Sequence, residues 1–190
     1  LKRYREFLKF CVCGLFYQAG IAVVITLSAV YAQLVMKFTT AQTITLILVV
    51  NITAAIGAFV FGYVQDRLGH KKTLALTILL WIIMGVMAAF SHGPVSFWIA
   101  ANIAGIAMGS SQSAGRAVVA VFAPAGELAQ FYSAWNVAVW GANVLGPITY
   151  GTVTWLTSGD QRTAILVTTL FFVIGLLILR RVHLPSKTVC

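Results

Sequence analysis

Two long apolar runs are joined by a short charged turn, Gly62-Tyr63-Val64-Gln65-Asp66-Arg67-Leu68-Gly69-His70-Lys71-Lys72. This turn indicates the fold class most directly. Its first glycine has no side chain and would let a neighbouring helix approach closely. Asp66 stands where the chain leaves the first run, a position suited to pairing with an arginine or with the positive end of an adjacent helix. Gly69 permits a tight reversal, and the two lysines would anchor the turn at a lipid surface. Taken alone, the stretch predicts a charged hairpin between two membrane-spanning helices.

The composition excludes a soluble globular enzyme. The chain has 190 residues, of which 60% are hydrophobic and only 9% charged, whereas a soluble domain carries roughly 25% charged residues. So few charges cannot cover a surface exposed to water, and so apolar a chain is not disordered. The net charge of +9 raises nucleic acid as a partner. The charges lie between long apolar blocks, however, so we expect the lipid bilayer as the partner and no nucleic acid.

The apolar runs predict six membrane spans. A bilayer core of about 30 Å requires roughly 20 apolar residues in a helix. The longest run without a charge, between Lys72 and Arg116, holds 43 residues and is divided by Ser91-His92-Gly93-Pro94. We therefore predict an all-α, integral membrane six-helix bundle that forms one domain over residues 1–190, with spans near 10–35, 43–64, 73–90, 95–115, 131–156 and 163–180.

A cleaved secretory signal is an alternative for the first run. Lys2 to Lys9, the apolar run and Val30-Tyr31-Ala32 loosely resemble such a signal. The run is too long for an ordinary signal core, and cleavage would leave an odd number of helices. The chain begins at Leu1 rather than Met, and we expect it to be a piece of a longer protein.

The basic residues predict the orientation. With six spans both termini lie on one side, and the side rich in Lys and Arg faces the cytoplasm. We therefore predict cytoplasmic termini in a bacterial inner membrane. The other side holds only Lys37 and Arg162, whereas this side holds eleven basic residues: Lys2, Arg3, Arg5, Lys9, Arg67, Lys71, Lys72, Arg116, Arg180, Arg181 and Lys187.

The charged turn resembles the cytoplasmic-loop signature of the major facilitator superfamily, Gly-x-x-x-Asp-[Arg/Lys]-x-Gly-[Arg/Lys]-[Arg/Lys]. His70 stands where that family commonly has Arg, which leaves the charge at this position in doubt. In that family the signature lies between the second and third spans of each six-span half, which is its place in this sequence. The matching residues are Gly62, Asp66, Arg67, Gly69 and Lys71.

A second stretch resembles the C-terminal half of the branch related to fungal vacuolar amino-acid effluxers. That branch has Gly-Gly-x-Gln-x-x-x-Arg, then Pro, an acid, an aromatic pair and a Gly-Pro. Here Ser110 replaces the second glycine of the run Gly109 to Arg116. The remaining matches are Pro124, Glu127, Phe131, Tyr132, Gly146 and Pro147.

This resemblance implies the C-terminal half of a twelve-span secondary transporter. Its partners would be an N-terminal six-span half and a small solute, which it would move by alternating access, with amino-acid-like efflux as the activity. No chemistry on the solute is implied. The alternative is a stand-alone six-helix membrane scaffold or assembly partner without transport activity.

Four charged residues are candidates for a cytoplasmic cluster that ties spans two, four and five together. They are Asp66 and Arg67 of the signature, together with Arg116 and Glu127. Arg116 lies near the cytoplasmic end of its span, and Glu127 follows the next turn. The alternative is that Arg116 only extends its side chain to the membrane surface.

Uncharged polar residues within the spans are candidates for solute contact. Asn136, Trp140 and Asn143 recur at helical spacing and form one stripe on the fifth span. Together with Gln112 they are our candidate substrate cavity, and Gln18, Asn51, Asn102 and Trp135 belong to the same class. The alternative role of each is a hydrogen bond between helices. Gly146-Pro147 interrupts the backbone hydrogen bonds of the fifth span and is a candidate helix hinge or a packing defect.

Catalytic and metal chemistry are not expected. No acid lies in the middle of a predicted span, and no His lies within reach of Ser110 or Ser111. Cys11-x-Cys13 fits no common metal or redox spacing, and Cys190 is remote in sequence. We therefore expect no enzyme activity, no metal and no cofactor.

Overall fold

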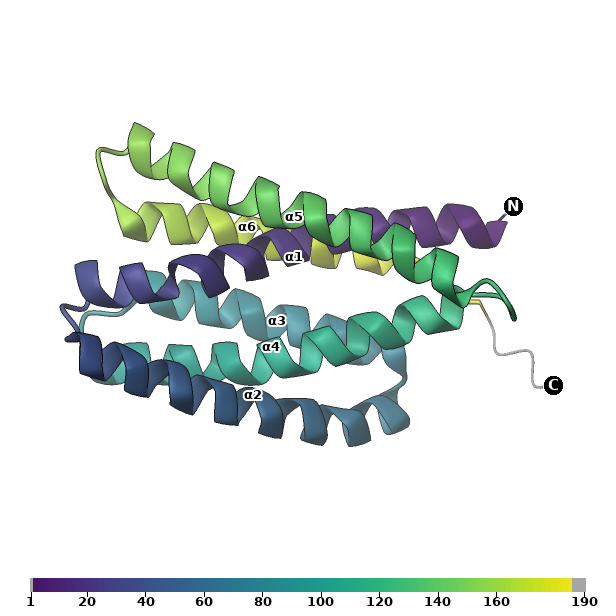
Figure 1. Ribbon diagram of the computed structural model, residues 1–190, viewed down its shortest axis with the longest axis horizontal. Coiled ribbons are helices and arrows are strands. Elements are labelled where there is room, and N and C mark those ends of the chain that lie inside the picture. Colours follow the sequence, from purple (N-terminus) through teal and green to yellow (C-terminus); the bar gives the residue numbers. More distant parts are fainter. Residues whose placement is uncertain (1, 186–190) are drawn as a thin grey trace.

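Six long α-helices run side by side in alternating directions (Figure 1). The computed structural model describes residues 2–185, so Lys187 and Cys190 lie outside the described residues. The all-α six-helix bundle predicted from the sequence is confirmed. The helices are α1 (Lys2–Leu34), α2 (Thr40–Leu68), α3 (His70–Phe90), α4 (Pro94–Phe122), α5 (Leu128–Leu156) and α6 (Gln161–Arg181).

Each helix overlaps one predicted span, but several extend beyond it at the end where α1 begins. Helix α1 begins at Lys2 rather than near residue 10, and α4 continues past Arg116 to Phe122. Charged residues end an apolar run without ending the backbone hydrogen bonds, so a helix continues into a polar environment. Helix ends are set by caps instead. Thr39 and Gln42 form a capping box at the start of α2, and Gly69 ends α2 with a φ of 82°.

Four helices in the described part of the chain, α1, α2, α3 and α6, are long and apolar enough to cross a membrane by length and composition. Helices α4 and α5 have 29 residues each and are as long as α2. They carry more Gly, Ser, Asn and Gln, which lowers their hydropathy. These two helices therefore carry many of the uncharged polar side chains of the bundle.

The first three helices and the last three helices pack in equivalent ways but run in opposite directions. Helix α2 packs mainly on α4, and α5 packs mainly on α1 in the same way. Helix α3 contacts α4 and α6 contacts α1, while α3 and α6 contact each other. Exchanging α1 with α4, α2 with α5 and α3 with α6 leaves this pattern unchanged. The chain is thus two inverted three-helix repeats, as in many transporter folds.

Glycines allow the closest approaches between helices. A side chain at Gly105 or Gly109 of α4 would collide with α2 backbone, so this Gly-x-x-x-Gly pair is a packing site. The equivalent contact in the other repeat is Gly146 of α5 against the carbonyl of Ala19 in α1. A Cβ at Gly62 would meet no atom of another helix within 4 Å, so the expectation that Gly62 admits a neighbouring helix is not met within the described residues.

Helices α3 and α6 form the central antiparallel pair. Trp81 and Phe172 are each the twelfth residue of their helix, and their rings stack with centroids 5.3 Å apart and planes 6° from parallel. Both side chains are fully buried. Trp81 Nε1 also donates a hydrogen bond of 3.2 Å to Ser111 Oγ of α4. This aromatic stack therefore joins the two repeats at their middle.

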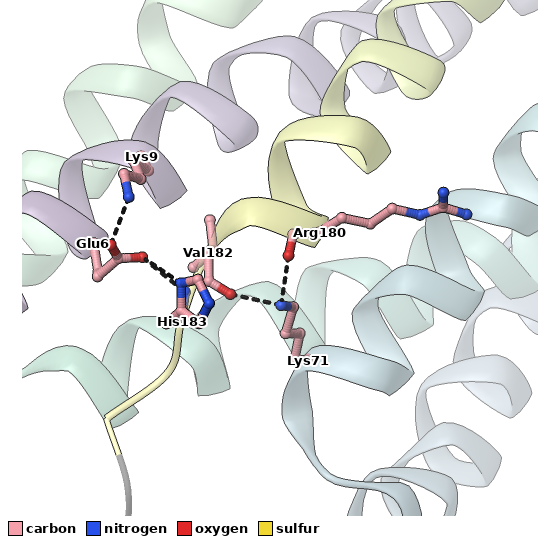
Figure 2. Close-up of polar contacts among 6 residues, drawn as sticks. All are labelled: Glu6, Lys9, Lys71, Arg180, Val182 and His183. Carbon is pink, nitrogen blue, oxygen red and sulfur yellow. Dashed lines mark hydrogen bonds and ion pairs between the residues drawn. The ribbon is translucent and has the colours of Figure 1, made fainter.

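The same two helices cap each other at both ends. Lys71, the second residue of α3, donates from Nζ to the carbonyl oxygens of Arg180 (3.0 Å) and Val182 (2.6 Å) at the end of α6 (Figure 2). Arg162, the second residue of α6, donates to the carbonyl oxygen of Ser91 (2.8 Å) at the end of α3. The last carbonyls of a helix have no partner within it, and a cation there also favours the helix dipole.

Further polar contacts fasten the start of α1 to the same end of the bundle. Glu6 accepts hydrogen bonds from Lys9 Nζ (2.6 Å) and from the backbone N–H of His183 (2.7 Å) (Figure 2). Arg3 Nε donates to the carbonyl oxygen of Phe122 (2.6 Å) at the end of α4. The start of α1 thus binds the ends of both α4 and α6.

We predict that Lys71→Met and Arg162→Met each destabilise the bundle by about 1–2 kcal/mol, because each leaves helix-terminal carbonyls without a charged donor. Thermal unfolding in detergent measures this. Lys72→Met is the matched control for Lys71, since Lys72 is exposed and has no side-chain hydrogen bond among the described contacts. Equal melting temperatures for Lys71→Met and Lys72→Met would contradict the capping role.

We also predict an acid-sensitive attachment at Glu6. The Lys9 ammonium and the His183 N–H lower the pKa of Glu6 from 4.5 to about 2. A lowered pKa stabilises the folded state above pH 4.5, and this contribution is lost as the pH falls from 4.5 towards 2. The melting-temperature difference between the native protein and Glu6→Gln should therefore be constant at neutral pH and shrink through this acid range. A difference that does not change with pH would show that the Glu6 carboxylate is not involved.

Candidate solute-contact site

The centre of the bundle holds a pair of glutamine amides. Gln18 of α1 and Gln112 of α4 face each other, and Gln112 Nε2 donates a hydrogen bond of 3.2 Å to Gln18 Oε1. Gln18 is buried at 4% exposure, and Gln112 is half-buried. The pair joins the two helices that correspond to each other in the inverted repeats. Each amide has two N–H groups and one oxygen, so one mutual bond leaves several hydrogen-bonding groups unused.

A tyrosine hydroxyl lies next to this pair. Tyr17 is fully buried, and its hydroxyl has no hydrogen-bond partner among the described residues. Gly115 of α4 makes room for it, since a Cβ there would lie 2.6 Å from the hydroxyl oxygen. The Trp135 ring of α5 lies 6.2 Å from the Tyr17 ring, centroid to centroid. A buried hydroxyl without a hydrogen-bond partner lowers the stability of the protein. The Tyr17 hydroxyl is therefore suited to form a hydrogen bond with a bound ligand.

The polar stripe of α5 does not join this pair. Asn136, Trp140 and Asn143 share one face, as predicted, but that face is exposed, and Trp140 has 68% of its surface free. The opposite face of α5 packs on α1 through Trp135 and Gly146. Of the four candidate cavity residues, the bundle therefore places Gln112 inside and the three α5 residues on an outer face.

The Gly146-Pro147 pair lies within one continuous helix. Helix α5 runs from Leu128 to Leu156 with Pro147 inside it, so this pair does not break the helix. A side chain at Gly146 would collide with the Ala19 carbonyl of α1, so this glycine allows α5 to approach α1 closely. The expected hinge stays a prediction, and the visible role of Gly146 is close packing.

The signature residues divide into two groups. Gly69 makes the tight turn with positive φ, and its N–H donates to the carbonyl oxygen of Gln65 (2.9 Å). Lys71 caps α6 and thus acts within the bundle rather than only as a lipid anchor. Asp66 and Arg67 are exposed at the end of α2. Neither makes an ion pair or a side-chain hydrogen bond within residues 2–185.

The four candidate cluster residues are not paired with one another within the described part of the chain. Glu127 precedes α5 and accepts a hydrogen bond of 2.8 Å from the Tyr4 hydroxyl, which raises the pKa of Tyr4. Arg116 is exposed, and its carbonyl accepts a bond from the Tyr132 hydroxyl (2.9 Å). Ties between spans two, four and five by Asp66, Arg67, Arg116 and Glu127 stay a prediction.

Two features of the structure are not predicted from the sequence. The capping roles of Lys71 and Arg162 depend on which helix ends lie side by side, and no local pattern carries that information. The pairing of Gln18 with Gln112 depends on the antiparallel contact of α1 with α4. An inverted repeat between the two halves of the sequence is the signal that could have indicated the helix caps and the glutamine pair.

Known proteins resemble the whole chain. The family model described as "Vacuole effluxer Atg22 like" matches residues 1–189. An uncharacterized MFS-type transporter, YxiO of Bacillus subtilis, is 27% identical over 188 residues, which cover 99% of this chain and 43% of that protein. A putative metabolite transport protein of Haemophilus influenzae is 33% identical over 133 residues, covering 68% of this chain and 32% of that protein. The chain thus spans less than half the length of these relatives.

Solved transporters have the same fold. The Escherichia coli fucose:proton symporter FucP matches with a TM-score of 0.80 at 16% identity, over 95% of this chain and 43% of that one. The xylose transporter XylE of Escherichia coli matches with a TM-score of 0.78 at 20% identity, over 96% of this chain and 48% of that one. The chain therefore belongs to the Atg22-like vacuole effluxer family of the major facilitator superfamily, and it has the fold of one half of such a transporter.

Proposed function

We propose that residues 1–190 form the C-terminal half of a secondary transporter that moves a small solute by alternating access. The solute would pass along α1 and α4, where the Gln18–Gln112 pair contacts it. The bundle would rock against an N-terminal six-helix half, and no chemistry would be performed on the solute. Efflux of an amino-acid-like solute is the specific activity we propose, on the family resemblance.

The Gln18–Gln112 pair is the observation that supports this proposal most. Transporter solutes bind near the membrane midplane at an interface between repeats, and the pair joins the corresponding helices of the two inverted repeats. The amides are uncharged and keep unused donors and acceptors, so they suit amide, hydroxyl or carboxylate groups of a small polar solute. The buried Tyr17 hydroxyl adds a further free hydrogen-bonding group beside them.

Exposed polar residues on α5 and at the end of α2 support a partner half. Helices α2 and α5 lie at opposite edges (Figure 1), and each buries only a few of its side chains. The exposed face of α5 carries the stripe of Asn136, Trp140 and Asn143, and amides are costly in contact with lipid tails. We propose that this stripe and the free Asp66 and Arg67 contact the N-terminal half.

We further propose the orientation and the membrane. The start of α1, the α2–α3 and α4–α5 turns and the end of α6 share one end of the bundle (Figure 1). That end holds all basic residues described except Lys37 and Arg162, which favours the cytoplasmic side. The two curated relatives come from bacteria, which supports the bacterial inner membrane.

Counterflow of labelled amino acids into proteoliposomes that contain the full-length transporter tests the proposed function. Gln18→Leu and Gln112→Leu should each slow exchange by about tenfold, because each removes one solute hydrogen bond of about 1.4 kcal/mol. Gln33→Leu is the matched control, since Gln33 is exposed near the end of α1 and should exchange at the native rate.

Thermal unfolding of the same variants separates lost function from lost folding, because leucine keeps the side-chain volume in an apolar setting. Native exchange rates for both Gln18→Leu and Gln112→Leu would contradict the proposed solute contact. A native protein that exchanges none of the amino acids would contradict the amino-acid part alone.

A further inference from the structure

A cavity of about 250 Å³ lies beyond the glutamine pair, towards the end of the bundle where α3 and α6 meet at Ser91 and Arg162. Residues of all six helices line it. Its floor is the stacked Trp81–Phe172 pair with Met84, all at most 5% exposed. Ile25 of α1 and Ile47 of α2 line its mouth and are 57% and 44% exposed. The cavity therefore runs from an open apolar mouth between α1 and α2 down to the centre of the bundle.

Among the described residues, every polar side chain that lines this cavity except Ser28 makes a hydrogen bond within the protein. The Tyr31 hydroxyl donates to the carbonyl oxygen of Ala88 (2.9 Å), and the Thr168 and Thr169 hydroxyls donate to carbonyls of their own helix. Asn51 Nδ2 donates to the carbonyl oxygen of Ile47 (2.8 Å). No charged residue lines the cavity within the described part of the chain. These bonds leave little to hold water or a polar solute.

A cavity of this kind stays dry or takes an apolar ligand. Apolar cavities of about 150 Å³ remain empty of water yet bind a benzene-sized molecule, so this larger one has room for an apolar chain. An empty cavity also deprives its lining of dispersion contacts. The exposed isoleucines at the mouth match lipid tails rather than water. We propose that this cavity is a binding site for the acyl chain of a membrane lipid, which enters between α1 and α2.

Photolabelling in nanodiscs tests this site with the full chain. The probe is phosphatidylethanolamine with a diazirine near the end of one acyl chain, and mass spectrometry locates the adducts. We expect adducts on Trp81 or Met84, which bulk lipid does not reach because these side chains are buried. Phe10 and Phe122, also fully buried but outside the cavity lining, should stay unlabelled.

Variants of α4 supply the matched control. Ala101 lines the cavity and is half-buried, so Ala101→Leu fills it and should abolish the adducts on Trp81 and Met84. Ala120 is exposed on the same helix outside the cavity, so Ala120→Leu should keep them. Ser28→Leu at the α1 side is a second filling variant, in case Ala101→Leu fails to fold.

Three results would overturn the proposal. One is the absence of lipid adducts on both Trp81 and Met84. Another is persistence of these adducts when Ala101→Leu or Ser28→Leu folds normally. The third is labelling of the floor by a small free diazirine hydrocarbon but not by the lipid, which would assign the cavity to a small apolar molecule. None of these results depends on transport, so they are independent of the counterflow experiment.

Discussion

The fold depends on one constraint, which is that the last carbonyls of each helix have no partner within that helix and must find one elsewhere in the protein. The antiparallel pair α3 and α6 meets it reciprocally, since Lys71 caps the end of α6 and Arg162 caps the end of α3. The Trp81–Phe172 stack joins the same pair midway. Arg162 is one of the two basic residues at the end of the bundle that is poor in Lys and Arg, and its side chain makes this capping bond there.

The remaining helices are positioned by close backbone contacts. Glycines of α4 admit α2, and Gly146 of α5 meets the Ala19 carbonyl of α1. Such contacts leave no space for side chains between the helices, so the positions of α2 on α4 and of α5 on α1 are tightly determined. The outer face of α5 is not determined in this way, which agrees with a second bundle packing against it. The proposed solute path and the proposed lipid cavity then lie in sequence along α1 and α4.

Sequence reasoning predicted the number of helices and the family, because apolar runs and the turn signature are local patterns. It also placed Asn136, Trp140 and Asn143 of α5 on one face. It did not separate Gln112 from that stripe, because periodicity shows which residues share a face but not what the face contacts. It read Lys71 as a lipid anchor, since the cap depends on the end of α6, far away in the chain.

We propose that the Gln18–Gln112 pair lies on a water-accessible path that opens to one side of the membrane at a time. A single cysteine at position 112, with Cys11, Cys13 and Cys190 replaced by serine, reports this through its reaction with a membrane-impermeant methanethiosulfonate. We expect Gln112→Cys to react from either side, to be slowed by solute, and to exceed Ala107→Cys, which is fully buried on the same helix. A Gln112→Cys protein that transports solute but reacts from neither side would show that position 112 does not lie on a water-accessible path.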